Sequence, residues 1–250
     1  MTSKFLSLAD GRTLAYCLTE GKLPGVVFCG GFKSDMTGSK AMALEAFCKQ
    51  RGQRFVRFDY TGHGQSSSAF VDGTIGAWKQ DALDILDHIA TGENVIVGSS
   101  MGGWIMLLVA LARKKQVKGL VGVASAPDFT EDLIWELMTD EQREDMKTKG
   151  VIHMPSCYGE DPYPITRNLI DEARNHRVLD QLVIDIDVPV RLIHGTKDDD
   201  VPWQFSQVLM EKLASKDVCL RLVKDGGHRL SEPDQLEMMC QLLSEVLSKA

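Results

Sequence analysis

Short apolar runs rich in β-branched residues alternate with longer segments of helical periodicity along most of the chain. Such runs predict strands, and their nearly continuous apolar character is typical of a parallel sheet covered by helices on both faces. The predicted strands span residues 13–18, 26–29, 54–59, 95–98, 119–124, 188–194 and 218–223.

Segments with helical periodicity separate these strands. Thr74 is placed to cap a helix whose Trp78, Ala82 and Ile85 share one face with Ile89. Residues 101–113 are almost wholly apolar, which predicts a helix buried against the centre of the sheet, and residues 205–213 predict another.

The last helix is predicted after residue 230. Ser231 would cap it, Pro233 would lie in its first turn, and the core face would hold Leu236, Met239, Leu243 and Val246. Repeated βα units imply right-handed crossovers. They predict an α/β fold with a doubly wound, mostly parallel sheet.

The alternation is interrupted between residues 128 and 187. This stretch has a charged helical pattern with prolines at 155, 162 and 164, and no strand is predicted in it. An insertion of roughly 60 residues is too long for a plain crossover. We therefore expect residues 1–127 and 188–250 to form the core, and residues 128–187 to form a helical cap over the active site.

Composition excludes some partners but identifies no substrate. The chain has 250 residues, 44% of them hydrophobic, with 28 Lys and Arg against 35 Asp and Glu, a net charge of -7. An acidic surface repels phosphate backbones, so nucleic acid is not expected as a partner. No apolar run is long enough to span a membrane, and residues 1–5 do not form a signal or transit peptide.

The six cysteines are scattered, without the paired spacing of a metal site. They are Cys17, Cys29, Cys48, Cys157, Cys219 and Cys240. We expect reduced, mostly buried thiols in an intracellular compartment, with Cys29 and Cys219 inside strands. Neither a metal nor an organic cofactor is expected.

The motif Gly98-Ser99-Ser100-Met101-Gly102 joins a predicted strand to a predicted helix. A serine in this G-x-S-x-G context stands on a sharp, strained turn that exposes its hydroxyl as a nucleophile. The Met101 N–H, at the start of the helix, has no partner within that helix and is predicted to bind an oxyanion.

Two glycine-containing turns follow earlier strands. The turn at Gly30 and Gly31 is predicted to supply a second oxyanion donor from the Phe32 N–H. The second turn, Asp59 to Ser66, has the pattern D-x-x-G-x-G-x-S, and we expect it to be structural. His63 in that turn is expected to be a turn residue rather than a base.

A nucleophilic serine needs a base and a carboxylate that orients it, in the chain order Ser, acid, His. Asp198 follows a strand in the arrangement H-G-x-x-D-x-x-V-P and is the predicted acid, whereas Asp199 and Asp200 are expected to be solvated. His228, after two glycines and another strand, is the predicted base. Asp128 stays an alternative acid.

Together these motifs resemble those of the α/β-hydrolase superfamily along the whole chain apart from the cap. The phrases FCGGFKSDMTGSKA, FDYTGHGQSS, VGSSMGGW and HGTKDDDVPW are most similar to mitochondrial superfamily members that act as palmitoyl-protein thioesterases and acyl-glucuronide esterases. The resemblance implies hydrolysis of S-acylated proteins and drug acyl glucuronides, and a mitochondrial location, with the transit peptide missing from this chain.

The acyl pocket is expected to be lined by Trp135, Leu137 and Met138 from the cap and by Trp203 from the acid loop. Two alternatives stay open. A triad alone does not choose among acyl donors, so a carboxylesterase or lipase acting on small metabolites fits the same residues. A non-catalytic member of the fold that binds a ligand under its cap is the second. No oligomeric state is predicted.

Overall fold

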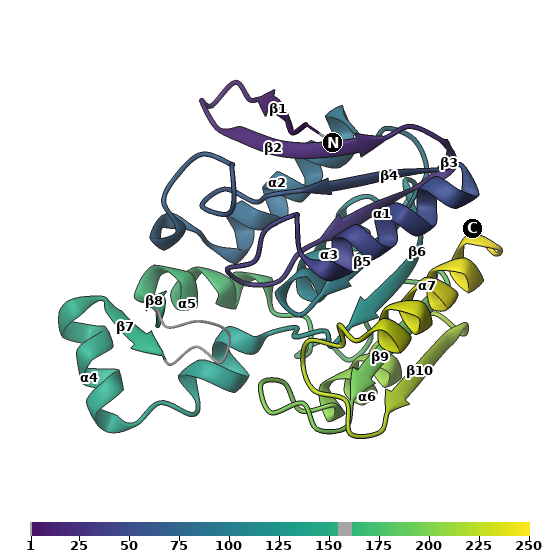
Figure 1. Cartoon of the computed structure of the whole chain (residues 1–250). Helices are drawn as coiled ribbons and strands as arrows, with labels where there is room; N and C mark the ends of the chain where they lie inside the picture. Colours follow the sequence, from purple (N-terminus) through teal and green to yellow (C-terminus); the bar gives the residue numbers. More distant parts are fainter. Residues whose placement is uncertain (1, 155–161) are drawn as a thin grey trace.

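An eight-stranded, mostly parallel sheet forms the centre of the computed structural model, which describes residues 2–154 and 162–250 (Figure 1). Strands β1 and β2 run antiparallel to their neighbours, and the other pairs are parallel. In sheet order the strands are β1 (Lys4–Ser7), β2 (Thr13–Thr19), β4 (Gln53–Phe58), β3 (Lys22–Cys29), β5 (Asn94–Ser99), β6 (Val117–Val123), β9 (Val190–Gly195) and β10 (Val218–Val223). The predicted fold class is therefore confirmed.

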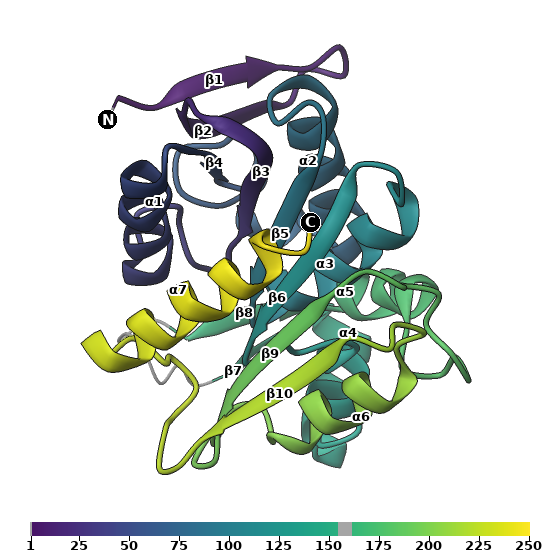
Figure 2. The ribbon, with the colours of Figure 1, turned by 90° about the vertical axis from the view of Figure 1, so that its right-hand side faces the viewer.

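Helices cover both faces of the sheet (Figure 2). One face carries α1 (Ser39–Arg51) and α7 (Pro233–Leu247), whose buried residues form a common apolar cluster with the strands. The other face carries α2 (Ile75–His88), α3 (Met101–Ala112) and α6 (Gln204–Lys212). Two layers of helices remove the sheet from water, which explains why its central strands are almost wholly apolar.

Local sequence signals explain where two of these helices begin. The Thr74 hydroxyl accepts a hydrogen bond from the Ala77 N–H at 3.1 Å, so the predicted cap of α2 is present. The predicted cap of α7 is wrong by one residue: Glu232, not Ser231, is the N-cap and forms a capping box with Gln235. Pro233 at the first helical position determines this register.

Strand β1 and helix α1 of the core were not predicted. Strand β1 is a four-residue edge strand that pairs with β2 alone among the described strands, and because it is short and largely exposed it has little apolar signal of its own. Helix α1 has Gly38 as its N-cap, so no side chain caps it, and its first turn has no acidic residue. Both elements form because the neighbouring sheet offers them a partner.

The segment between β6 and β9 has its own secondary structure at one end of the sheet (Figure 1). It contains a π-helix (Thr130–Trp135), α4 (Asp140–Lys149), β7 (Val151–Met154), β8 (Tyr163–Thr166), α5 (Arg167–Ala173) and a 3₁₀ turn (Arg174–His176). The expectation of no strand here is wrong, because β7 and β8 pair as an antiparallel ribbon. Four-residue strands are too short for periodicity to reveal. The division into core and cap stays a prediction.

The cysteines only partly match expectation. Cys17, Cys29 and Cys48 are buried and free, and Cys240 is half-buried. Cys219 is exposed, because its strand β10 lies at the edge of the sheet and is less covered by neighbouring elements than a central strand is. Cys157 lies outside the described residues. Within the described part of the chain, no helix has the length and apolar character needed to cross a bilayer.

Candidate active site

Ser100 occupies a strained turn between β5 and α3. Its φ of 55° and ψ of -121° place a non-glycine residue in a region that costs energy and is held only by surrounding contacts. The Ser100 N–H donates to the Val123 carbonyl at 2.9 Å, and the Ser100 carbonyl accepts from the N–H groups of Gly103 and Ala126. The backbone of the neighbouring strand thus holds the serine in this conformation.

The glycines on either side of Ser100 are required by close backbone approach. A Cβ atom at Gly98 would overlap the carbonyl of Gly102, and one at Gly102 would overlap the carbonyl oxygen of Cys29. Both overlaps involve main chain, which cannot rotate away as a side chain can. The G-x-S-x-G spacing therefore follows from the packing of α3 against β3.

Three loops at the carboxyl ends of parallel strands bring Ser100, His228 and Asp198 into one hydrogen-bonded chain. His228 Nε2 lies 3.0 Å from Ser100 Oγ, and His228 Nδ1 lies 2.8 Å from Asp198 Oδ2. The serine follows β5, the aspartate follows β9 and the histidine follows β10. Parallel strands end on the same edge of the sheet, so residues far apart in sequence meet there.

The carboxylate of Asp198 is buried and its two oxygens are fully used. Oδ1 accepts from the N–H groups of Asp200 at 3.0 Å and Val201 at 2.8 Å, and Oδ2 accepts from His228 and His194. Burial alone raises the pKa of Asp198, but the hydrogen bonds from the two histidines outweigh it and hold the pKa well below its usual range. Asp198 is therefore ionised at neutral pH and able to orient an imidazole.

His194, the histidine of the H-G-x-x-D-x-x-V-P arrangement, is a further residue of the site, and no role was assigned to it from the sequence. It is fully buried, with Nδ1 2.7 Å from Ser206 Oγ and Nε2 3.0 Å from Asp198 Oδ2. Its position four residues before the acid was visible in the sequence. Only the path of the loop after β9 shows that the ring turns back onto the carboxylate.

Asp128, the alternative acid, lies elsewhere. Its carboxylate accepts hydrogen bonds from the N–H groups of Val178 and Leu179, at 2.7 to 3.1 Å, rather than from His228. Burial raises its pKa to about 6. Asp128 thus joins the two ends of the inserted segment, and its contacts are those of a structural residue.

A cavity of about 760 Å³ opens at Ser100. Its apolar lining comes largely from the inserted segment and the turn after β3, and its rim is charged. The apolar residues include Phe32, Met101, Phe129, Leu133, Ile134, Met154, Tyr163 and Ile165, and the charged residues are Lys33, Asp35, Lys40, Asp200 and Arg229. A cavity of this size and lining suits an extended apolar group with a polar end.

The predicted pocket residues are not the ones that line this cavity. The guanidinium groups of Arg143 and Arg174 both lie over the Trp135 ring, and Leu137 is 70% exposed. Met138 is buried in an apolar cluster that also contains the cavity residues Ile134 and Ile165, but it does not itself line the cavity. Neither these three nor Trp203 belongs to the cavity wall formed by residues 2–154 and 162–250. The side of each helix that faces the cavity is decided by packing.

The backbone beside Ser100 offers two hydrogen-bond donors. Phe32 and Met101 both line the cavity, and among the described residues neither amide N–H donates to a protein acceptor. Met101 is the first residue of α3, whose N-terminal N–H groups carry partial positive charge. These two N–H groups therefore stay the candidates for the predicted oxyanion hole.

Asp198, Asp200 and His228 are the one group of possible metal ligands that the described part of the chain brings together. Both ring nitrogens of His228 already lie within hydrogen-bond distance of Ser100 and Asp198. A metal there would have to displace these partners, so the donor set suits proton transfer better than metal binding.

Comparisons of the sequence and of the structure with known proteins indicate the same family. Residues 26–237 match the Alpha/beta hydrolase family. The chain is 40% identical over 246 residues to the bovine palmitoyl-protein thioesterase ABHD10, mitochondrial, covering 98% of this chain and 80% of the relative.

Two solved structures have the same fold at similar identity. Mouse α/β hydrolase domain-containing protein 10 is 38% identical, with a TM-score of 0.92 over 100% of this chain and 99% of that one. A putative hydrolase from Agrobacterium vitis S4 is 37% identical, with a TM-score of 0.94 over 99% and 100% of the two chains. The family match covers most of the chain, and the chain belongs to the α/β-hydrolase family.

Proposed function

We propose that this protein is a serine hydrolase that cleaves acyl thioesters and esters through an acyl-enzyme on Ser100. The observation that carries the proposal is the hydrogen-bonded chain from Ser100 through His228 to Asp198, open to a largely apolar cavity. Asp198 is the acid, His228 the base, and the N–H groups of Phe32 and Met101 form the oxyanion hole.

The first half of the reaction forms the acyl-enzyme. Asp198 accepts from Nδ1 of His228, so this tautomer leaves the lone pair of Nε2 facing the Ser100 hydroxyl. As Oγ attacks the acyl carbonyl, its proton passes to Nε2, and the Asp198 carboxylate stabilises the resulting imidazolium. The carbonyl oxygen becomes an oxyanion held by the two N–H groups, each contributing about 3 kcal/mol.

The second half releases the acid. The tetrahedral intermediate collapses, the carbon–sulfur or carbon–oxygen bond breaks, and His228 returns the proton to the leaving thiolate or alkoxide. A water molecule then gives a proton to His228 and attacks the acyl carbonyl. Collapse of this second intermediate frees the carboxylic acid and Ser100 regains its proton.

The proposed substrates are S-acylated proteins, with long acyl chains such as palmitoyl. Support comes from the names of the relatives and from the apolar wall that Phe32, Phe129 and Leu133 contribute to the cavity. Acyl glucuronides are proposed as a second substrate. Three cationic residues line the rim of the same cavity, Lys33, Lys40 and Arg229, and they suit a leaving group that has a carboxylate. The proposal includes the mitochondrial location given in the relatives' names, which cell fractionation tests.

The test combines covalent labelling with turnover. Wild-type protein, Ser100→Ala and His228→Ala are incubated with a fluorophosphonate probe, and intact mass is measured. We expect one adduct in the wild type, none in Ser100→Ala, and strongly reduced turnover in both variants.

A thioester and an oxygen ester with the same palmitoyl chain, together with an aryl acyl glucuronide, then test the substrate class. Preference for the thioester supports the thioesterase assignment, and hydrolysis of the ester alone indicates a carboxylesterase or lipase. Folded wild-type protein with neither adduct nor turnover contradicts the proposal and favours a ligand-binding protein.

A further inference from the structure

We propose that His63 is a positioning residue for the oxyanion hole. Its imidazole accepts a hydrogen bond from the Lys33 N–H and thereby holds the turn that presents the Phe32 N–H beside Ser100. The inference rests on the proposed function, since it concerns the donor at Phe32, and it assigns His63 a role that a turn residue would not need.

The contact between His63 and Lys33 joins two turns that are distant in the sequence. His63 Nε2 lies 3.1 Å from the Lys33 nitrogen, and the ring is 4% exposed. Lys33 has a φ of 55°, which is unfavourable for a side chain of its size and requires support from outside the turn. The hydrogen bond fixes the peptide unit directly after Phe32, and so restricts the direction of the Phe32 backbone.

Aromatic packing also links the His63 ring to Phe32. The Phe32 ring lies edge-on to Phe70, with centroids 4.9 Å apart, and to Trp78 at 5.8 Å. The His63 ring makes edge contacts with the same two rings, at 5.2 and 5.3 Å. Phe32 and His63 therefore share one aromatic wall, and a shift of either side chain is transmitted to the other.

Thr61 determines which nitrogen of His63 has the proton. The Thr61 carbonyl can only accept, and His63 Nδ1 lies 3.2 Å from it, so Nδ1 is the donor. In the neutral ring Nε2 is then an acceptor, as the Lys33 N–H requires. Burial lowers the pKa of His63 to about 4, although the backbone hydrogen bond to Thr61 acts in the opposite direction. Because this pKa is well below 7, the ring is neutral near pH 7.

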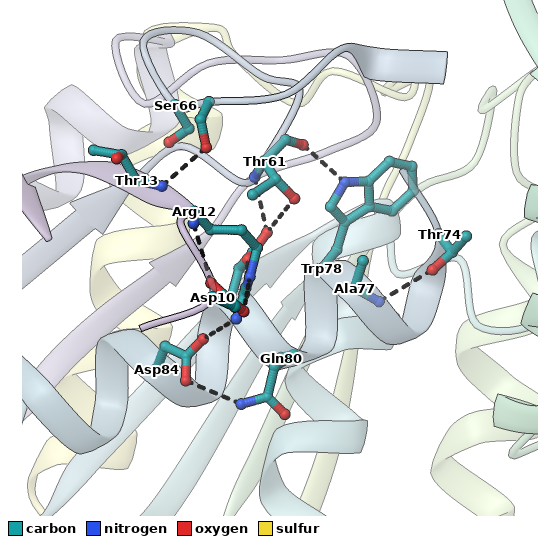
Figure 3. A network of polar contacts seen from close by, with 12 residues as sticks. Asp10, Arg12, Thr13, Thr61, Ser66, Thr74, Ala77, Trp78, Gln80 and Asp84 are labelled. Atoms are coloured by element: carbon teal, nitrogen blue, oxygen red, sulfur yellow. Dashed lines mark hydrogen bonds and ion pairs between the residues drawn. The ribbon is translucent and has the colours of Figure 1, made fainter. Parts of the chain in front are cut away.

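A network below the turn holds Thr61 itself (Figure 3). The Thr61 N–H and hydroxyl both donate to Oδ2 of Asp81 at 2.8 Å, and Trp78 Nε1 donates to the Thr61 carbonyl at 3.0 Å. Asp81 is fully buried and pairs with Arg12, which also pairs with Asp84 at 2.8 Å. The His63 ring is thus attached to a rigid part of the core, which a positioning residue needs.

The test compares two amide substitutions that differ by one methylene. In His63→Gln the side-chain oxygen can reach the former place of Nε2 and accept from Lys33, whereas in His63→Asn it reaches only the place of Nδ1. We expect His63→Asn and His63→Ala to lower kcat about 10- to 100-fold with KM changed less than about threefold, and His63→Gln to retain most of kcat. His88→Ala, an exposed histidine of α2, is the matched control and is expected to leave kcat unchanged.

Affinity for a trifluoromethyl ketone that forms a tetrahedral adduct provides a readout that mere stability would not move. We expect this affinity to fall by the same factor as kcat/KM in His63→Asn, because both depend on oxyanion binding. Wild-type-like kcat in folded His63→Asn, or equal loss in the Asn and Gln variants, overturns the inference and leaves the proposed function intact. Absence of Ser100-dependent turnover in the wild type overturns the proposed function, and the inference with it.

Discussion

His194 Nε2 lies 3.0 Å from Oδ2 of Asp198, the same oxygen that His228 Nδ1 approaches to 2.8 Å. One carboxylate oxygen therefore contacts two imidazoles, one from a residue before Asp198 in the chain and one from a residue after it. Val201 and Ser206 complete the surroundings of His194, through a carbonyl at 2.9 Å and a hydroxyl at 2.7 Å. His194 thus provides Asp198 with a second side-chain partner besides the proposed base.

Replacing His194 tests this support. His194→Leu removes a donor to Asp198 and leaves buried polar groups of Ser206 and Val201 without a partner. We expect the free energy of unfolding to fall by about 2–4 kcal/mol and kcat/KM to fall about tenfold, measured by urea denaturation and ester turnover. Ser206→Ala keeps the Nε2 contact and is expected to lose stability but little activity. Equal losses of activity in the two variants would contradict the assignment.

The pH dependence of stability tests the burial of Asp128. Burial raises the pKa of its carboxyl to about 6, so the folded protein binds this proton more tightly than the unfolded chain does. The group therefore favours folding below about pH 4, its usual pKa, and that contribution is lost as the pH rises through 6. Between pH 4 and 7 we expect wild type to lose about 3 kcal/mol relative to Asp128→Asn. Parallel pH profiles of the two proteins would refute this.

Gly102→Ala tests the backbone contact behind the nucleophile. Its Cβ would overlap the Cys29 carbonyl oxygen, so α3 must move away from β3. We expect loss of fluorophosphonate labelling at Ser100 and a fall of the thermal midpoint by several degrees, equivalent to at least about 2 kcal/mol. Gly150→Ala, at a φ of 72° with open space around it, costs only about 1 kcal/mol and should label normally. Full labelling of Gly102→Ala would show that the contact is not needed.

Leu133→Trp tests which residues bound the acyl group. Leu133 lines the cavity, so a larger side chain reduces its volume. We expect kcat/KM for a palmitoyl thioester to fall more than tenfold while that for a butyryl thioester changes less than threefold. Leu137→Trp, at the exposed position that sequence reasoning placed in the pocket, is expected to change neither value. A chain-length effect in Leu137→Trp instead would place the acyl group elsewhere.

Much of the active-site geometry follows from short segments whose chemistry and backbone shape are linked. Gly98 and Gly102 leave room for one sharp turn, and that turn lifts Ser100 above the sheet. Asp198 and His228 follow strands of the same sheet, so topology alone brings them to the same edge. Periodicity was sufficient for the long apolar strands and for α2 and α3, because burial on both faces leaves a strong signal.

Elements that depend on a partner were not predictable in this way. The ribbon of β7 and β8 is too short to have a periodic pattern, and Pro164 argues against a strand until its pairing with His153 is seen. The exposure of Cys219 depends on which strand lies at the sheet edge, and strand order is a property of the whole fold.

The fold class, the positions of most core strands along the chain, and Ser100, Asp198 and His228 as candidates could all be inferred from the sequence alone. Local steric limits and hydrophobic periodicity act within a few residues, so they can be recognised in the sequence. Three features could not be inferred in this way: Leu133 lines the cavity, His194 contacts Asp198, and His63 accepts a hydrogen bond from the Lys33 N–H. Those contacts join segments whose relative orientation is determined by packing of the complete core, and no local pattern encodes it.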